Sequence, residues 1–248
     1  MMSFALPNTL PDPHRWFSAS HFIMLGLIAG FALAHSGLAA LRLEAEKRVG
    51  PRAYRVLFAI VSISLAVVLI TYFLNHRYDG VQLWQVQGQP WVMPFVWVLS
   101  AVSFLFLYPS TFNLLEIAAI QQPKVHLYDA GIVRITRHPQ MVGQVIWCVA
   151  HTLWVGTTFT LATSFALIGY HLFAVWHGDR RLTIRYGDAF AKVKAQTSVI
   201  PFLAVLQGRQ TLNLQEFLRP AYLGIAAFVA LFWWAHPLMI RASAGIPW

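Results

Sequence analysis

The stretch HFIMLGLIAGFALAHSGLAAL, residues 21–41, contains no Asp, Glu, Lys or Arg and decides the fold. A helix of about 20 apolar residues is long enough to cross the hydrocarbon core of a bilayer. Four further uncharged runs follow, at residues 56–74, 80–115, 139–178 and 220–240. The 139–178 run is long enough for two spans with a turn near residue 157, and the 80–115 run begins as a loop broken by Gly and Pro.

Hydrophobic residues make up 58% of the 248-residue chain and charged residues only 11%, too few to keep the surface of a soluble globule hydrated. Only helices and closed barrels satisfy the backbone in lipid, and no run alternates with the period of a barrel strand. The sequence therefore predicts an all-α, polytopic integral membrane bundle of about six transmembrane helices in a single domain, residues 1–248. The expected helices are approximately 20–41, 55–74, 91–116, 139–156, 159–178 and 220–240.

The distribution of positive charge predicts the orientation of this bundle. All but three of the 18 Lys and Arg residues fall on one side if the N-terminus lies outside, the exceptions being Arg15, Arg77 and Arg241. Such an excess marks the cytoplasmic or stromal side. It also accounts for the net charge of +9 without a nucleic-acid partner. The N-terminal residues lack the basic start of a cleavable signal peptide, and no plastid transit peptide is expected in them.

Three histidines, His35, His151 and His171, fall inside the expected spans. Ionisable groups at such positions usually face the bundle interior and serve a function, although a neutral imidazole can simply bond a carbonyl of the next helix. The spans offer almost no oxygen ligands for hard cations, and two histidines on different helices suit the axial positions of a haem iron. Helix spacing alone leaves open whether His151 or His171 pairs with His35.

Cys148, the chain's one cysteine, shares a helix face with His151. A single cysteine excludes an internal disulfide and a thiolate cluster. Cys148 is expected either to bind or tune a metal as a thiolate or to pack as a small apolar residue.

Two polar motifs flank the basic side: RITRHPQMVGQ (134–144), with Arg137 and His138, and WHGDRRLTIRYGDAF (176–190), with Arg180 and Arg181. Basic residues at this level can bind anionic lipid head groups. Their grouping with an acid also suits a clamp for a phosphate or for haem propionates. Both interpretations stay open at this point.

Six segments together resemble the 15-cis-ζ-carotene isomerases, within the wider NnrU-domain family. They are AHSGLAALR (34–42), GPRAYRVLF (50–58), YFLNHRYDGVQLW (72–84), FLYPSTFNLLE (106–116), RITRHPQMVGQVIWCVAHTLW (134–154) and VWHGDRRLTIRYGDAF (175–190). The resemblance implies a membrane enzyme with ferrous haem b that isomerises the central double bond of 9,15,9′-tri-cis-ζ-carotene to give the 9,9′-di-cis form. It also implies that His35 and His151 are the axial ligands, with Cys148 as an alternative ligand.

The same resemblance implies a C40 carotenoid substrate within the bilayer, contact with membrane lipids and association with other enzymes of carotenoid synthesis. The expected location is the thylakoid or plasma membrane of a cyanobacterium, or a plastid membrane. Two alternatives remain: a membrane haem protein of nitrogen-oxide metabolism, and an S-adenosylmethionine-dependent membrane methyltransferase. The second also carries an RHP motif, but here Met141 stands where an aromatic residue is usual, and His177-Gly178-Asp179 stands where paired glutamates are expected.

Overall fold

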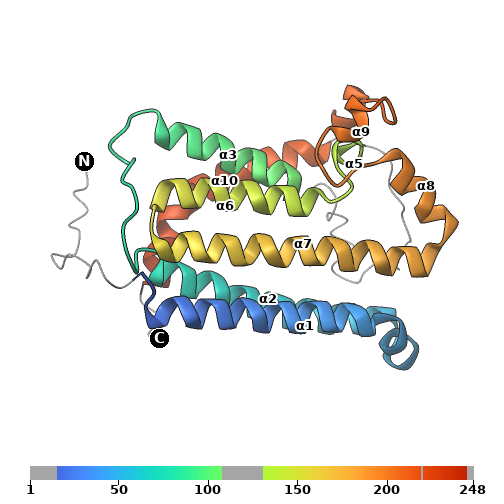
Figure 1. The fold of residues 1–248 in the computed structure, drawn as a ribbon, viewed down its shortest axis with the longest axis horizontal. Coiled ribbons are helices and arrows are strands. Elements are labelled where there is room, and N and C mark those ends of the chain that lie inside the picture. Colours follow the sequence, from blue (N-terminus) through green and yellow to red (C-terminus); the bar gives the residue numbers. More distant parts are fainter. Residues whose placement is uncertain (1–15, 108–130, 219, 245–248) are drawn as a thin grey trace.

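The computed structural model describes residues 16–107, 131–218 and 220–244. Six helices run along one another to form the body (Figure 1). They are α1 (Ala19–Val49), α2 (Pro51–His76), α3 (Val92–Leu107), α6 (Pro139–Val155), α7 (Thr158–Tyr186) and α10 (Pro220–Ser243). Four shorter helices gather at the end where α7 finishes: α5 (Ile132–Ile135), α8 (Asp188–Gln196), α9 (Leu203–Leu206) and the 3₁₀ helix η1 (Leu214–Phe217). No strand forms within the described residues.

The apolar surface of the bundle points outward, which confirms the all-α membrane fold. Four helices are long and apolar enough to cross a membrane: α1, α2, α7 and residues Tyr222–Ser243 of α10. Only 11% of the most apolar window of α1, and 6% of that of α10, is buried within the protein. Such faces are stable in contact with lipid chains rather than water. The count of six spans stays a prediction, since α3 is described only to Leu107 and α6 has 17 residues.

Two helices continue well past the uncharged runs that predicted them. The predicted 20–41 span is part of α1, which runs to Val49, and the predicted 159–178 span is part of α7, which runs to Tyr186. The last turns of α1 carry ion pairs at helical spacing, such as Arg42 with Glu46 at 2.6 Å. These pairs stabilise a helix in water, so the helix does not end where the apolar run ends.

The helices pack through small residues and aromatic rings. Ser103 on α3 donates a hydrogen bond to the carbonyl of Gly143 on α6 at 2.8 Å. A Cβ at Gly143 would lie 2.7 Å from the Ser103 carbonyl oxygen, so only glycine permits this approach. Elsewhere α1, α2, α6 and α7 enclose an apolar cluster that includes Phe73 and Phe159. This cluster lies toward the end of the bundle where α7 begins.

The loop between α2 and α3 closes the end of the bundle opposite α8. Its side chains and backbone donate to the last carbonyls of α6: Trp84 Nε1 to Leu153 at 2.9 Å, Gln82 Nε2 to Val155 at 2.8 Å, and the Leu83 amide to Gly156 at 2.7 Å. The final carbonyls of a helix have no partner within the helix. The loop therefore supplies the C-terminal cap of α6.

Candidate functional site

His35 sits on α1 between two aromatic rings. Its ring stacks on Phe31, with centroids 5.3 Å apart and planes inclined by 13°, and lies 4.7 Å from the ring of Phe58 on α2. Its Nδ1 is 3.0 Å from the hydroxyl oxygen of Ser62. This contact fixes the plane of the imidazole and leaves Nε2 directed away from the hydroxyl.

His151 on α6 and His171 on α7 both have Nδ1 close to the backbone carbonyl four residues earlier. The Nδ1 of His151 lies 3.0 Å from the Trp147 carbonyl oxygen, and the Nδ1 of His171 lies 2.9 Å from that of Leu167. A carbonyl only accepts, so Nδ1 carries the proton in the neutral ring and Nε2 keeps its lone pair. The indole of Trp147 also stacks on His151 at a centroid distance of 3.8 Å.

These contacts fit a metal-bound imidazole, because ligating histidines usually donate the second ring nitrogen to a carbonyl or carboxylate. The described residues include no group of three or more His, Cys, Asp or Glu that could hold a bare metal ion. A haem needs only one or two protein ligands, because the porphyrin supplies the others. The donor set therefore fits a haem better than a mononuclear metal centre.

The histidines lie at different depths along the bundle. At 1.5 Å of rise per residue, His35 lies about 24 Å from the start of α1, and His151 lies about 6 Å from the end of α6. His171 lies about 20 Å from the start of α7 by the same rise. All three helix ends lie at the same end of the molecule (Figure 1). The structure thus brings His35 and His171 to a similar level, whereas His151 lies closer to the α2–α3 loop.

Cys148 is 1% exposed and belongs to the face of α6 that packs inside the bundle. The side-chain amide of Gln144 lies 3.6 Å from its sulfur. The thiol is therefore shielded from water in this arrangement.

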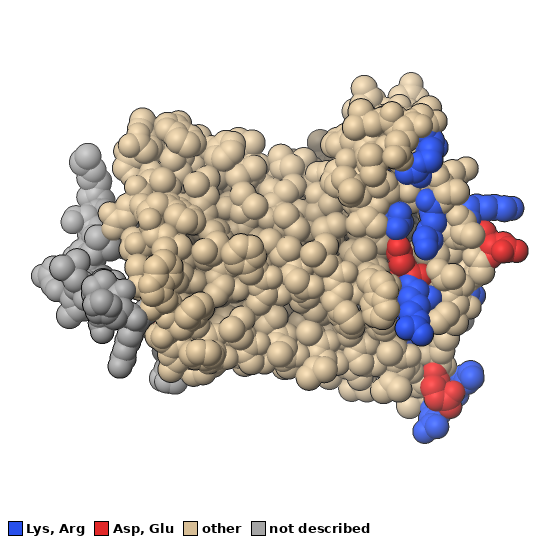
Figure 2. All heavy atoms as spheres, viewed as in Figure 1, with Lys and Arg blue, Asp and Glu red and all other residues tan. Residues whose placement is uncertain are grey.

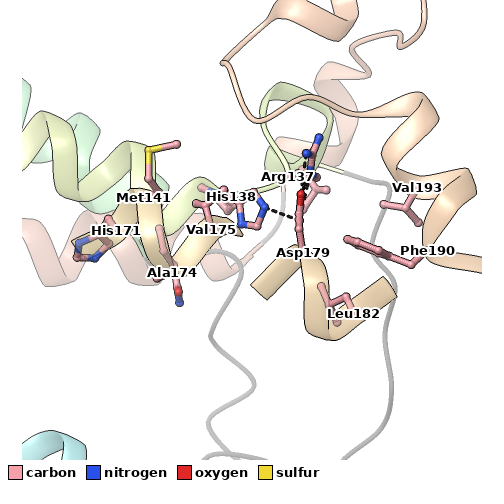
Figure 3. Close-up of a pocket in the computed structure, with 13 residues that line it drawn as sticks. Arg137, His138, Met141, His171, Ala174, Val175, Asp179, Leu182, Phe190 and Val193 are labelled. Carbon is pink, nitrogen blue, oxygen red and sulfur yellow. Dashed lines mark hydrogen bonds and ion pairs between the residues drawn. The ribbon is translucent and has the colours of Figure 1, made fainter. Parts of the chain in front are cut away.

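A second polar group lies at the opposite end of the bundle, between the start of α6 and the later turns of α7. Asp179 accepts from the guanidinium of Arg137 at 2.7 Å and lies 2.8 Å from Nε2 of His138 (Figure 3). Pro139 starts α6 directly after His138, and the backbone bond from the Arg137 amide to the Ser198 carbonyl holds the motif in place. The arginine and histidine expected to clamp propionates therefore already have a carboxylate partner.

A pocket of about 350 Å³ opens beside this cluster. Figure 3 shows His171 and Met141 at one side of it and the Arg137–Asp179–His138 cluster at another. Apart from Gln140, the remaining wall is apolar, with Ala174 and Val175 from α7 and Phe190 and Val193 from α8 among its residues. Arg180 and Arg181, predicted to join the clamp, do not line this pocket: Arg180 is exposed and lies 5.8 Å from the ring of Trp176.

Sequence reasoning did not find the partners of the histidines. Trp147 could have been found, because it lies four residues before His151 and hence on the same helix face. Ser62 could not have been found, because its contact with His35 depends on how α1 and α2 are aligned. No pattern in the sequence specifies this alignment.

The fold and these sites define an all-α membrane protein whose apolar bundle carries histidines held by hydrogen bonds at Nδ1. Residues 23–244 match the family described as NnrU protein, and the chain belongs to that family. It is 57% identical over 228 residues to a protein from Arabidopsis thaliana named 15-cis-zeta-carotene isomerase, chloroplastic, covering 91% of this chain and 62% of that protein. A protein of the same name from Zea mays is 55% identical over 235 residues, with 93% and 64% covered.

These similarities confirm the resemblance that the sequence motifs indicated. The chain spans less than two thirds of the length of these two relatives, at 62% and 64%. No solved structure matches the chain.

Proposed function

We propose that this chain is a carotenoid cis–trans isomerase that acts on the central 15-cis double bond of ζ-carotene. The observation that supports this most strongly is the identity of 57% and 55% to two proteins named for this activity, over more than nine tenths of the chain. The proposed reaction converts 9,15,9′-tri-cis-ζ-carotene to the 9,9′-di-cis form and involves no net oxidation or reduction.

The distribution of polar groups suits a hydrocarbon substrate. The described carboxylates lie toward the ends of the bundle: Glu44, Glu46, Asp79, Asp179, Asp188 and Glu216. Among the described residues, the middle of the bundle offers apolar side chains, aromatic rings and histidines, and no carboxylate that could act as acid or base on an unactivated polyene. A C40 carotenoid dissolves in the bilayer and would reach the protein laterally between helices.

We propose further that the chain binds haem b through His35 and His151, as the family resemblance implies. When bound, ferrous haem would supply electron density to the polyene and lower the order of the bond that rotates. The anchored Nδ1 atoms of both histidines leave Nε2 for iron, and Phe31, Phe58 and Trp147 would pack on the porphyrin. The two histidines lie at different depths along the bundle, so the test of the ligand pair includes His171.

The first test is the absorption spectrum of the purified protein in detergent, oxidised and then reduced with dithionite. We expect a Soret band that His35→Ala and His151→Ala each weaken or shift. His171→Ala is the matched comparison, because its ring has the same Nδ1 bond and lies nearer the level of His35. If the spectrum changes in His35→Ala and His171→Ala but not in His151→Ala, the ligands are His35 and His171, and the proposed pair is wrong.

Activity is tested separately, with ζ-carotene in liposomes and separation of the isomers by chromatography. Turnover in the ferrous state and its loss in the ferric state would support the proposed chemistry, whereas equal turnover in both would refute it. Protein that binds no haem would lead to a binding assay with S-adenosylmethionine, and haem without turnover would favour nitrogen-oxide chemistry.

The proposed location is a plastid or thylakoid membrane, since the two relatives are named chloroplastic. The basic end would face the stroma or cytoplasm. We also propose association with other enzymes of carotenoid synthesis, because the substrate and the product both stay in the bilayer.

A further inference from the structure

The 197–218 segment, which joins α8 to α10, has an unusual distribution of side chains. Small and hydroxyl residues face inward, with Thr197, Ser198 and Ala204 all buried. Leucines face outward, with Leu206 exposed by 82%, Leu214 by 76% and Leu218 by 85%. A water-exposed segment normally has the opposite pattern, so this surface is expected to meet an apolar environment.

The segment is held firmly against the start of α6. The Phe202 amide donates to the Ile135 carbonyl at 2.8 Å, and the Thr136 hydroxyl donates to the Val199 carbonyl at 2.8 Å. Phe202 has a φ of 62°, which is rare for a residue with a side chain. The outward leucines are therefore presented by a hydrogen-bonded scaffold, and the exposure of Leu206 is not the result of a loose loop.

The position of the segment places it at the level of the membrane surface. It ends at Leu218, just before α10 begins at Pro220, and residues Tyr222–Ser243 of that helix form a candidate span. Figure 1 shows α5 and α9 together at the α8 end of the bundle, and Figure 2 shows Lys and Arg gathered at that same end. A segment so close to the start of a span lies at the boundary between head groups and acyl chains.

We propose that the 197–218 segment is an interfacial membrane anchor, which inserts Leu206, Leu214 and Leu218 into the bilayer surface beside the spans. An exposed cation, Arg209, lies within the segment between Leu206 and Leu214. It complements the charge of anionic lipid head groups, and a basic residue next to exposed leucines is typical of interfacial segments. The apolar surface also continues onto α10, where Leu223 and Leu231 are exposed.

The proposal is tested by spin labels on single cysteines in bilayers that contain phosphatidylglycerol. Leu206→Cys and Leu218→Cys report on the segment. Lys194→Cys on α8 is the water-exposed control, and Leu231→Cys on α10 is the lipid-facing control. Native Cys148 is buried and gives no competing label. Collision of each label with oxygen, which concentrates in lipid, and with a water-soluble nickel chelate gives its depth.

We expect the labels at 206 and 218 to collide with nickel several-fold less often than the label at 194, and to collide with oxygen at a rate approaching that at 231. Nickel collision equal to that at 194 would place the segment in water and overturn the proposal. Protection from both reagents would indicate a protein partner or a second copy of the chain, and would also overturn it. None of these outcomes depends on haem or isomerase activity.

Discussion

Asp179 accepts from both Arg137 and His138, and the three side chains are only 14–17% exposed. Replacing the carboxylate with an amide in Asp179→Asn leaves a partly buried guanidinium without its counter-charge. We expect a loss of about 1.5–3 kcal/mol, the range for a lost hydrogen bond to a charged group. The measurement is the midpoint of thermal unfolding in detergent. Asp188→Asn is the matched control, because Asp188 is exposed on α8, and equal midpoints for the two variants would contradict the role of the cluster.

At this scale the sequence predicted residue types better than it predicted partners. It singled out His35, His151 and His171 because ionisable groups are rare in spans, and all three lie on helices of the bundle. It left open whether Arg137 and His138 bind lipid head groups or clamp a phosphate or propionate, and it did not predict that both pair with Asp179 on α7, the next helix. Such pairing depends on how α6 and α7 are aligned, which a single sequence does not specify.

At the scale of elements, the α2–α3 loop caps the last turn of α6, the turn that carries His151. Trp84→Phe keeps the aromatic ring but removes the N–H that bonds Leu153, at a cost of about 1 kcal/mol. We expect amide hydrogen exchange in the last turn of α6 to become about fivefold faster, as that free energy implies. Trp91→Phe is the control, since Trp91 is exposed and its indole contacts the ring of Phe95. Exchange that changes equally in both variants would mean that the cap is not what holds the turn.

Element boundaries show why the length of an uncharged run does not set the length of the helix that contains it. Pro139 and the glycine at position 156 delimit α6 as the sequence indicated, since proline favours a first turn and Gly156 adopts a left-handed φ of 69°. No such residue ends α1 near position 41 or α7 near position 178, so ion pairs and polar contacts carry both helices further. The loop after residue 80 was predicted, but its role as the cap of α6 was not, because its hydrogen bonds join residues about 70 positions apart.

At the scale of the whole molecule, charge is unevenly divided between the two ends of an apolar body (Figure 2). This asymmetry predicts that the basic end stays on the cytoplasmic side when the chain is made in bacteria. We expect a membrane-impermeant maleimide to label Gln85→Cys, on the α2–α3 loop, in intact cells. Lys47→Cys, near the end of α1, should be labelled only after the cells are opened. Both positions are exposed, and buried Cys148 contributes no background. The reverse labelling pattern would mean that another feature outweighs the positive charges and sets the orientation.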